Sequence, residues 1–204
     1  LYPGIKPMIA SDFSFFRRNV SNNIWRILFL VFLTEESDKE LVIYYVLLND
    51  FKYGNEVIFR RNLNCVNKAL KYSRKVSHEA HKWKGFLRFS KMKGNIYYAK
   101  FHADANILGI LADHFVKRLA NEYWVILDVG RNILCLYDKR EVTFCYGEDI
   151  HLQFHKDEDE REMEELWRVF FQTIAIKERK NLRCQESFMP KKYWQDMLEM
   201  EDIV

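Results

Sequence analysis

Residues 85–101, GFLRFSKMKGNIYYAKF, decide the fold because the hydrophobic pattern changes there from a helical to a strand-like period. Gly85 interrupts a long helical pattern, and apolar and polar side chains alternate over residues 86–90, which predicts a strand. Residues 93–95, KGN, carry a turn signal, and residues 96–101 then form the returning strand. The stretch therefore predicts a β-hairpin entered directly from a helix.

The segments before the hairpin predict helices. Residues 11–53 are helical in pattern, with Ser21 as a plausible N-cap of an apolar stripe that begins at Ile24. After a Gly-containing break, about 25 residues with apolar side chains at helical spacing lead into the hairpin. The first third of the chain is therefore predicted to be mostly helical.

The segments after the hairpin alternate between helix and strand. Asp104 is expected to cap a helix that extends to Phe115, and three strands are expected at residues 124–129, 133–137 and 142–146. A further helix from about Glu160 to Ile176 is expected to bury its apolar residues. These residues are Leu166, Trp167, Val169, Phe170 and Ile174. A short helix that begins at a proline is expected over residues 189–194.

This segregated order of helices and strands predicts an α+β fold with a mostly antiparallel sheet, made of a hairpin and a meander with packed helices. A length of 204 residues fits one domain. We expect a single domain over residues 1–204, with a mostly helical part (1–83), a part that contains the sheet (84–150), and C-terminal helices and tail (151–204).

The composition excludes several classes of protein. Hydrophobic residues make up 49% and charged residues 30%, as in an ordinary globular protein. The longest apolar run, residues 27–33, is far shorter than the roughly 20 residues of a membrane span, so no membrane association is expected. The four cysteines are scattered, without metal-ligand spacing, which favours a reduced cytoplasmic protein. No cofactor or metal is expected, because no Gly-rich phosphate loop or three-Cys motif is present.

The charge is distributed unevenly along the chain. Residues 60–93 hold eleven basic residues and a single acid, Glu79, which gives this window a net charge of +10, although the whole chain carries only +3. Residues 177–192 add six basic residues against two acids. Such windows are typical of surfaces that contact a phosphate backbone. The alternative is a solvated helix face with a basic strand edge.

Two groups of cations are candidates for nucleic-acid binding: one surrounds Gly85, and the other mixes with aromatic residues near the C-terminus. The candidate residues are Lys82, Lys84, Arg88, Arg179, Lys180, Lys191 and Lys192. The alternative interpretation is that Gly85 ends a helix and that the aromatic residues Tyr193 and Trp194 anchor the C-terminal segment to the core.

Weaker candidates exist for catalysis, where acid, base and phosphate-stabilising groups would have to meet in one cleft. These candidates are His81, Asp128, Glu178 and Arg179. A cluster of His102, Asp104 and His114 is a further possibility for metal binding or acid–base chemistry, but a structural role is the favoured interpretation.

Five short segments carry a family resemblance. They are 79–89 (EAHKWKGFLRF), 111–115 (LADHF), 124–126 (WVI), 178–181 (ERKN) and 188–194 (FMPKKYW). Together they resemble a bacterial family of "probable DNA metabolism" proteins, described by a domain of unknown function numbered 4130, from about residue 25 to about residue 200. The resemblance implies a companion of a radical SAM protein of DNA modification or repair, and a domain found fused to uracil-DNA glycosylase-like domains.

The chain departs from this family at two positions. Leu127 stands where members often have His before the Asp of the strand, and Leu182 stands where Pro often follows the Asn. The missing His weakens Asp128 as a catalytic candidate.

Three functions follow as expectations. The first is an accessory protein of DNA repair or modification that binds nucleic acid through a basic surface. The second is an enzyme that acts on DNA or nucleotides. The third is an interaction adaptor for a radical SAM or glycosylase-like partner.

Overall fold

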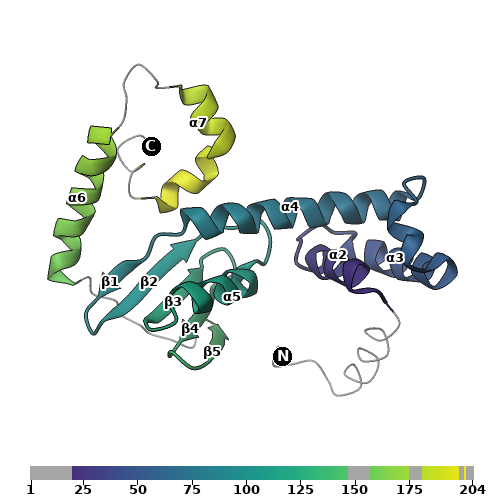
Figure 1. The fold of residues 1–204 in the computed structure, drawn as a ribbon, viewed down its shortest axis with the longest axis horizontal. Coiled ribbons are helices and arrows are strands. Elements are labelled where there is room, and N and C mark those ends of the chain that lie inside the picture. Colours follow the sequence, from purple (N-terminus) through teal and green to yellow (C-terminus); the bar gives the residue numbers. More distant parts are fainter. Residues whose placement is uncertain (1–19, 147–156, 175–180, 198–199, 201–204) are drawn as a thin grey trace. The chain divides into compact units, whose positions relative to one another are not determined.

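The computed structural model describes residues 20–146, 157–174, 181–197 and 200 (Figure 1). The described residues form helices and one five-stranded, mostly antiparallel sheet, which confirms the predicted α+β class. The chain divides into two compact units. The first comprises Leu1–Glu79 with Asp104–Asn106, and the second comprises Ala80–Ala103 with Ile107–Val204.

The regular elements of the first unit are all helices in the part of the chain that the structure describes. Its elements are α2 (Asn22–Phe32), α3 (Lys39–Tyr53), the 3₁₀ helix η1 (Gly54–Phe59) and most of α4 (Asn64–Phe86). Ser21 caps α2 as predicted, because its hydroxyl oxygen accepts the backbone N–H of Ile24 at 3.3 Å. Buried aliphatic side chains from all four helices form the core of this unit, including Ile24, Val46 and Val57.

Glu79, the single acid of the basic window, is a buried side chain on α4. Its carboxylate accepts the backbone N–H groups of Asp104 and Ala105, both at 3.0 Å. Asp104 does not cap the next helix, because the N-cap position is taken by Ile107, which corrects that prediction. The helix α5 (Leu108–Arg118) begins after Ile107, and its N-cap makes no side-chain hydrogen bond.

The helix α4 continues through Gly85 to Phe86 and the first strand begins only at Ser90, so the prediction of a strand is wrong for residues 86–89. Trp83 and Leu87 are both buried and lie one helical turn apart, and the N–H of Leu87 donates to the carbonyl of Trp83 at 3.0 Å. Burial of this pair favours the helical period over the alternation that residues 86–90 show in sequence. Arg88 then donates from its guanidinium to the Gly85 carbonyl at 2.9 Å, which satisfies a carbonyl of the last turn.

The sheet lies in the second unit and has the strand order β1-β2-β3-β4-β5. Its strands are β1 (Ser90–Met92), β2 (Ile96–Phe101), β3 (Tyr123–Asp128), β4 (Ile133–Tyr137) and β5 (Val142–Tyr146). Neighbouring strands pair antiparallel, except that β2 and β3 pair parallel and are connected through α5. The hairpin between β1 and β2 turns at Gly94 and Asn95, whose positive φ angles of 90° and 58° suit these residue types.

The helix α5 packs on β3 and β4 (Figure 1) and forms the centre of the second core. Leu111 and Phe115 on α5 are buried, as are Trp124 and Ile126 on β3. Trp83 at the end of α4 lies edge-on to Phe101 at the end of β2, with ring centroids 5.3 Å apart. The core therefore joins the last turn of α4 to the carboxyl end of β2.

The C-terminal elements are α6 (Glu158–Ile174), α7 (Leu182–Phe188) and the 3₁₀ helix η4 (Lys191–Asp196). The prediction that α6 buries its apolar residues is wrong for the four whose side chains are described. These are Leu166, Trp167, Val169 and Phe170, with exposed fractions from 40% to 61%. One contact between α6 and β1 is a hydrogen bond, in which the hydroxyl of Ser90 donates to the carboxylate of Glu164 at 3.4 Å. No helix in the described parts of the chain is long and apolar enough to cross a bilayer.

Candidate functional site

Two predicted nucleic-acid-binding residues from distant parts of the sequence meet at one aromatic ring. Lys82 comes from α4 and Lys192 from η4, and their ammonium nitrogens lie 5.6 and 5.0 Å from the centroid of the Tyr193 ring. Such distances are typical of cation–π contacts. Tyr193 is 2% exposed and packs edge-on against Trp83. Both cations therefore contact the Tyr193 ring, Lys82 from α4 and Lys192 from η4.

The helix η4 is built locally by its proline and its tryptophan. Pro190 has the extended conformation of an N-cap, and Tyr193 donates its N–H to the Pro190 carbonyl at 3.0 Å. The indole N–H of Trp194 donates to the carbonyl of Met189 at 2.8 Å, and Trp194 is buried. Tyr193 and Trp194 thus anchor the C-terminal segment, as the alternative interpretation of the sequence held.

The other predicted cations have more local contacts. Lys191 pairs with the carboxylate of Glu186 at 3.2 Å, and its ammonium group lies 5.8 Å from the centroid of the Trp194 ring. Lys84 is half-buried on α4, where its charge, together with the larger effect of burial, lowers the pKa of His114. Three further predicted site residues, Glu178, Arg179 and Lys180, lie outside the described residues.

A histidine–aspartate pair that the sequence does not reveal joins the end of β2 to η4. His102 follows β2 directly, and its Nδ1 lies 2.9 and 3.1 Å from the two carboxylate oxygens of Asp196. The Asp196 side chain is 1% exposed and that of His102 is 37% exposed. The only available signal for Asp196 was its position two residues after the Tyr193–Trp194 motif.

An ion pair lies at the end of the neighbouring strand. Asp128 closes β3 and is fully buried, and Arg131 donates to its carboxylate at 3.1 Å from the guanidinium and at 3.3 Å from the backbone. Burial raises the pKa of Asp128, whereas the charge and hydrogen bonds of Arg131 oppose this shift. Arg131 also donates to the carbonyl of Ala103, the residue after His102, at 3.2 Å.

The two pairs are therefore neighbours at the carboxyl ends of the parallel strands. Phe101 of β2 stands opposite Asp128 of β3 in the sheet register, and the N–H of Val129 donates to the Phe101 carbonyl. The crevice outside the carboxyl ends of parallel strands is where open α/β sheets bind ligands. We call the four residues His102, Asp196, Asp128 and Arg131 the strand-end cluster.

The remaining described catalytic candidate is His81, and its exposure to solvent differs from that of Asp128. His81 is exposed on α4, Asp128 is fully buried, and no hydrogen bond links the two in the part of the chain that the structure describes. His102, Asp104 and His114 do not form the cluster considered from the sequence either, because His102 pairs with Asp196 and His114 packs on the ring of Phe115. Among the described residues, no group of three or more His, Cys, Asp or Glu side chains is placed to hold a metal ion.

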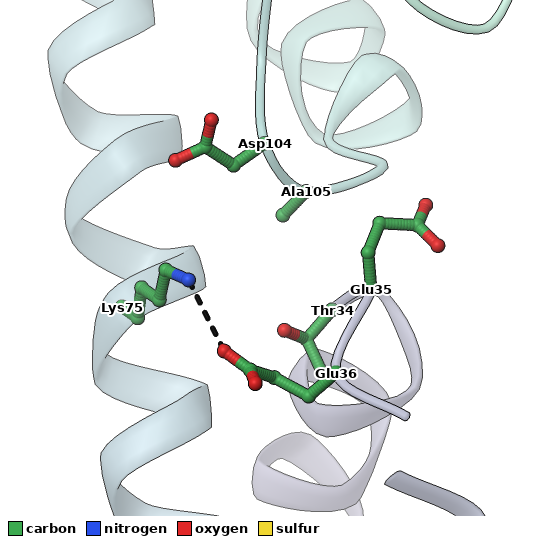
Figure 2. A pocket seen from close by; sticks show the side chains of 6 residues that line it. All are labelled: Thr34, Glu35, Glu36, Lys75, Asp104 and Ala105. Atoms are coloured by element: carbon green, nitrogen blue, oxygen red, sulfur yellow. Dashed lines mark hydrogen bonds and ion pairs between the residues drawn. The ribbon is translucent and has the colours of Figure 1, made fainter. Parts of the chain in front are cut away.

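The first unit contains a pocket whose charged lining is mostly acidic (Figure 2). It is lined by Thr34, Glu35, Glu36, Lys75, Asp104 and Ala105. Lys75 and Glu36 form an ion pair across it at 3.2 Å. With three carboxylates and one ammonium group, this pocket does not suit a phosphate.

The fold and the cluster define an α+β protein with a histidine–aspartate pair and a buried aspartate–arginine pair at the ends of its parallel strands. The chain belongs to the family of the domain of unknown function DUF4130, whose family model matches residues 37–199. No curated protein and no solved structure shows significant similarity to the chain.

Proposed function

We propose that this protein binds nucleic acid through a basic surface and acts as an accessory protein in DNA repair or modification. The basic surface comprises Lys82, Lys84, Arg88, Lys191 and Lys192. The observation that carries the proposal is the meeting of Lys82 and Lys192 at the Tyr193 ring. Two ammonium groups beside one ring contribute to a locally positive surface, and the phosphate backbone of a nucleic acid would be attracted to such a surface. Arg179 and Lys180, which lie outside the described residues, stay predictions from the sequence.

The burial of the aromatic residues determines the kind of binding proposed. Tyr193 and Trp194 are 2% and 4% exposed, so their rings offer no face on which a base could stack. The ammonium groups of Lys82 and Lys192 lie over the Tyr193 ring, 5.6 and 5.0 Å from its centroid, and we propose that their charge acts on phosphates. Contacts of this kind position a nucleic acid without reading its sequence. We therefore expect binding that is sensitive to salt and insensitive to base composition.

The test is fluorescence anisotropy of labelled single- and double-stranded DNA across a salt series. The double variant Lys82→Gln/Lys192→Gln should bind more weakly, and its plot of log affinity against log salt should be less steep by about one for each lost phosphate contact. The matched control is Lys117→Gln/Arg118→Gln, which removes two exposed cations from the last turn of α5. An equal loss in both double variants would indicate a general charge effect, and would contradict a defined basic surface.

A second candidate function is favoured by one observation on α6. Its exposed residues Met163, Leu166, Trp167 and Phe170 recur at helical spacing and form an apolar stripe. We propose that this stripe docks a radical SAM or uracil-DNA glycosylase-like partner, for which the protein would act as an adaptor. Each purified partner would be titrated by calorimetry against the wild type and against Leu166→Ser/Phe170→Ser. Binding to either partner that the double variant abolishes would support the adaptor, and equal binding by both proteins would contradict docking through α6.

A further inference from the structure

We propose that the strand β5 is a self-association surface, through which two copies of the chain pair edge to edge and antiparallel into one continuous sheet. This inference goes beyond the proposed function, and neither the basic surface nor the apolar stripe of α6 takes part in it. Two observations carry it: the two edges of the sheet differ in their protection, and the sequence of β5 is complementary to itself.

The edge formed by β1 is protected against a further strand. The carbonyl of Lys91, in the middle of this three-residue strand, accepts the backbone N–H of Asp157 at 3.1 Å. The ammonium group of Lys91 also lies 3.7 Å from the Asp157 carboxylate. Short length, a lysine and a covering segment are devices by which proteins prevent an edge strand from pairing with another chain. A partner strand therefore has no access to β1.

The opposite edge, formed by β5, lacks these devices in the part of the chain that the structure describes. Residues 142–146 (VTFCY) contain no charged residue, no proline and no glycine. The sheet order ends at β5, which pairs with β4 in a register without a bulge. Phe144 and Tyr146 on this strand are 42% and 61% exposed. An exposed, uncharged edge of this kind is a template for a further strand.

The side chains of β5 match those of a second β5 in antiparallel register. Val142, Phe144 and Tyr146 share one face of the sheet, since residues two apart in a strand point to the same side. If Phe144 stands opposite Phe144 of the second copy, Val142 stands opposite Tyr146 of that copy. Aromatic–aromatic and aromatic–β-branched pairs are favourable cross-strand pairs in antiparallel sheets. This register therefore pairs apolar side chains throughout that face.

The same face of β5 continues an apolar face that is buried on β4. In the register of these two strands, Phe144 stands opposite Cys135 and Val142 stands opposite Tyr137. Both β4 residues are buried, whereas Phe144 is exposed at the edge. A second β5 would give Phe144 an apolar neighbour on its outer side as well. Self-pairing therefore extends the burial that already exists between β4 and β5.

Symmetry favours a second copy of the chain as the occupant of this edge. A twofold axis perpendicular to a sheet runs two identical edge strands antiparallel, and twofold dimers are the commonest homo-oligomers. Because residues 142–146 carry no charge, the strand has no feature that would select a charged segment of another protein. Both outer edges of the paired sheet would then be β1, which is protected. Dimerisation thus covers the edge that the single chain leaves exposed.

The small size of the contact sets the expected strength of association. An aromatic side chain buries about 150–250 Å² in full, so the exposed parts of Phe144 and Tyr146 in both copies add about 400 Å². With the backbone and the smaller side chains, the contact stays below the roughly 1,200 Å² at which stable interfaces begin. We therefore expect a reversible dimer that dissociates on dilution.

Sedimentation equilibrium of the full chain over a concentration series measures this association. The average mass of the wild type should rise towards that of two chains as concentration increases. Phe144→Lys should weaken association at least about tenfold, because two ammonium groups would face each other across the twofold axis. Phe144→Glu should weaken it similarly through facing carboxylates. An equimolar mixture of the two variants should associate again, because the lysine of one copy then faces the glutamate of the other.

Two controls separate pairing from folding and from general charge effects. Phe59→Lys adds the same charge at an exposed phenylalanine of η1 in the first unit, and it should associate like the wild type. Hydrogen–deuterium exchange of residues 142–146 tests the wild type without any substitution. Their amides should exchange more slowly as protein concentration rises, because pairing protects the backbone of β5. Circular dichroism checks that each variant is folded.

Each contrary result would overturn the inference. One is a wild type that remains monomeric up to about 500 µM. Another is equal weakening by Phe144→Lys and Phe59→Lys, which would indicate a general charge effect. A mixture of Phe144→Lys and Phe144→Glu that fails to associate would contradict a pairing centred on Phe144. Protection of residues 142–146 that is the same at every concentration would show that the chain itself covers β5.

Discussion

At the scale of single residues, buried carboxylates account for much of the architecture. Glu79 holds the backbone of Asp104 and Ala105, whereas Asp128 pairs with Arg131. A charged group is buried only when hydrogen bonds or an opposite charge replace its water. Each of these carboxylates therefore depends on the segment that supplies its partner. A substitution that removes the carboxylate should destabilise that segment.

Glu79→Ala should lower the free energy of unfolding by about 2–4 kcal/mol, because two backbone N–H groups lose their acceptor. Glu79→Gln keeps one acceptor oxygen and should cost less. Urea unfolding followed by circular dichroism measures both changes, with the exposed Glu56→Ala as the control. A loss no larger than that of the control would show that Glu79 does not hold residues 104–105.

The Asp128 carboxyl should make stability depend on pH in a defined direction. Its pKa is raised above the ordinary value of 3.8, chiefly by burial, so the folded state holds this proton more tightly than the unfolded state. Its contribution to stability is therefore greatest in acid and falls as pH rises through the raised pKa. Urea unfolding across pH should show the wild type losing stability relative to Asp128→Asn as pH increases. A wild type that instead gained stability relative to Asp128→Asn as pH increased would contradict the raised pKa of Asp128.

The cysteines should react in an order set by their environment. Burial raises the pKa of Cys135 to about 12, and this residue is fully buried, whereas Cys184 is exposed. Because the thiolate is the reactive form, a maleimide should label Cys184 within the native protein and Cys135 only after unfolding. Peptide mass spectrometry of a labelling time course gives the order. Early labelling of Cys135 would contradict the position of β4 in the core.

At the scale of elements, local signals and tertiary contacts compete at the ends of helices. Ser21 caps α2 through a contact three residues away, which the sequence already indicated. By contrast, α4 continues through Gly85 because Trp83 and Leu87 are buried together. Short-range hydrogen bonds can be recognised from spacing, whereas burial depends on segments distant in sequence.

The cap of α2 gives a test at this scale. Ser21→Ala should lower the free energy of unfolding by about 1 kcal/mol, because the N–H of Ile24 loses its acceptor, and Ser21→Asp should keep most of the stability. Thermal unfolding followed by circular dichroism compares the three proteins. Equal stability of Ser21→Ala and the wild type would show that the cap does not contribute.

At the scale of the whole molecule, the described tryptophans differ in their access to solvent. Trp83, Trp124 and Trp194 are exposed by 4% or less, whereas Trp167 on α6 is 40% exposed. The apolar stripe of α6 is thus available to solvent, and Trp167 reports on it. This difference makes fluorescence a direct probe of whether α6 is covered.

Acrylamide should quench Trp167 most strongly, so Trp167→Phe should remove most of the quenchable fluorescence of the free protein. Trp25, which is half-buried, should account for the smaller remainder. Trp194→Phe, which removes a buried indole, is the control and should leave the quenchable fraction in place. Weak quenching of the wild type would indicate that another surface covers α6, such as a second copy of the chain.

The sequence by itself determined the α+β class, most element positions, the cap at Ser21 and the concentration of cations around Lys82. These features depend on side-chain period, turn chemistry and charge, which act between near neighbours. The roles of Arg179 and Lys180 stay predictions. Only the tertiary structure decided that β2 and β3 run parallel, that α6 exposes its apolar side, and that His102 pairs with Asp196 across 94 residues. Such contacts depend on which distant segments become neighbours in the packed chain, and no local pattern encodes that choice.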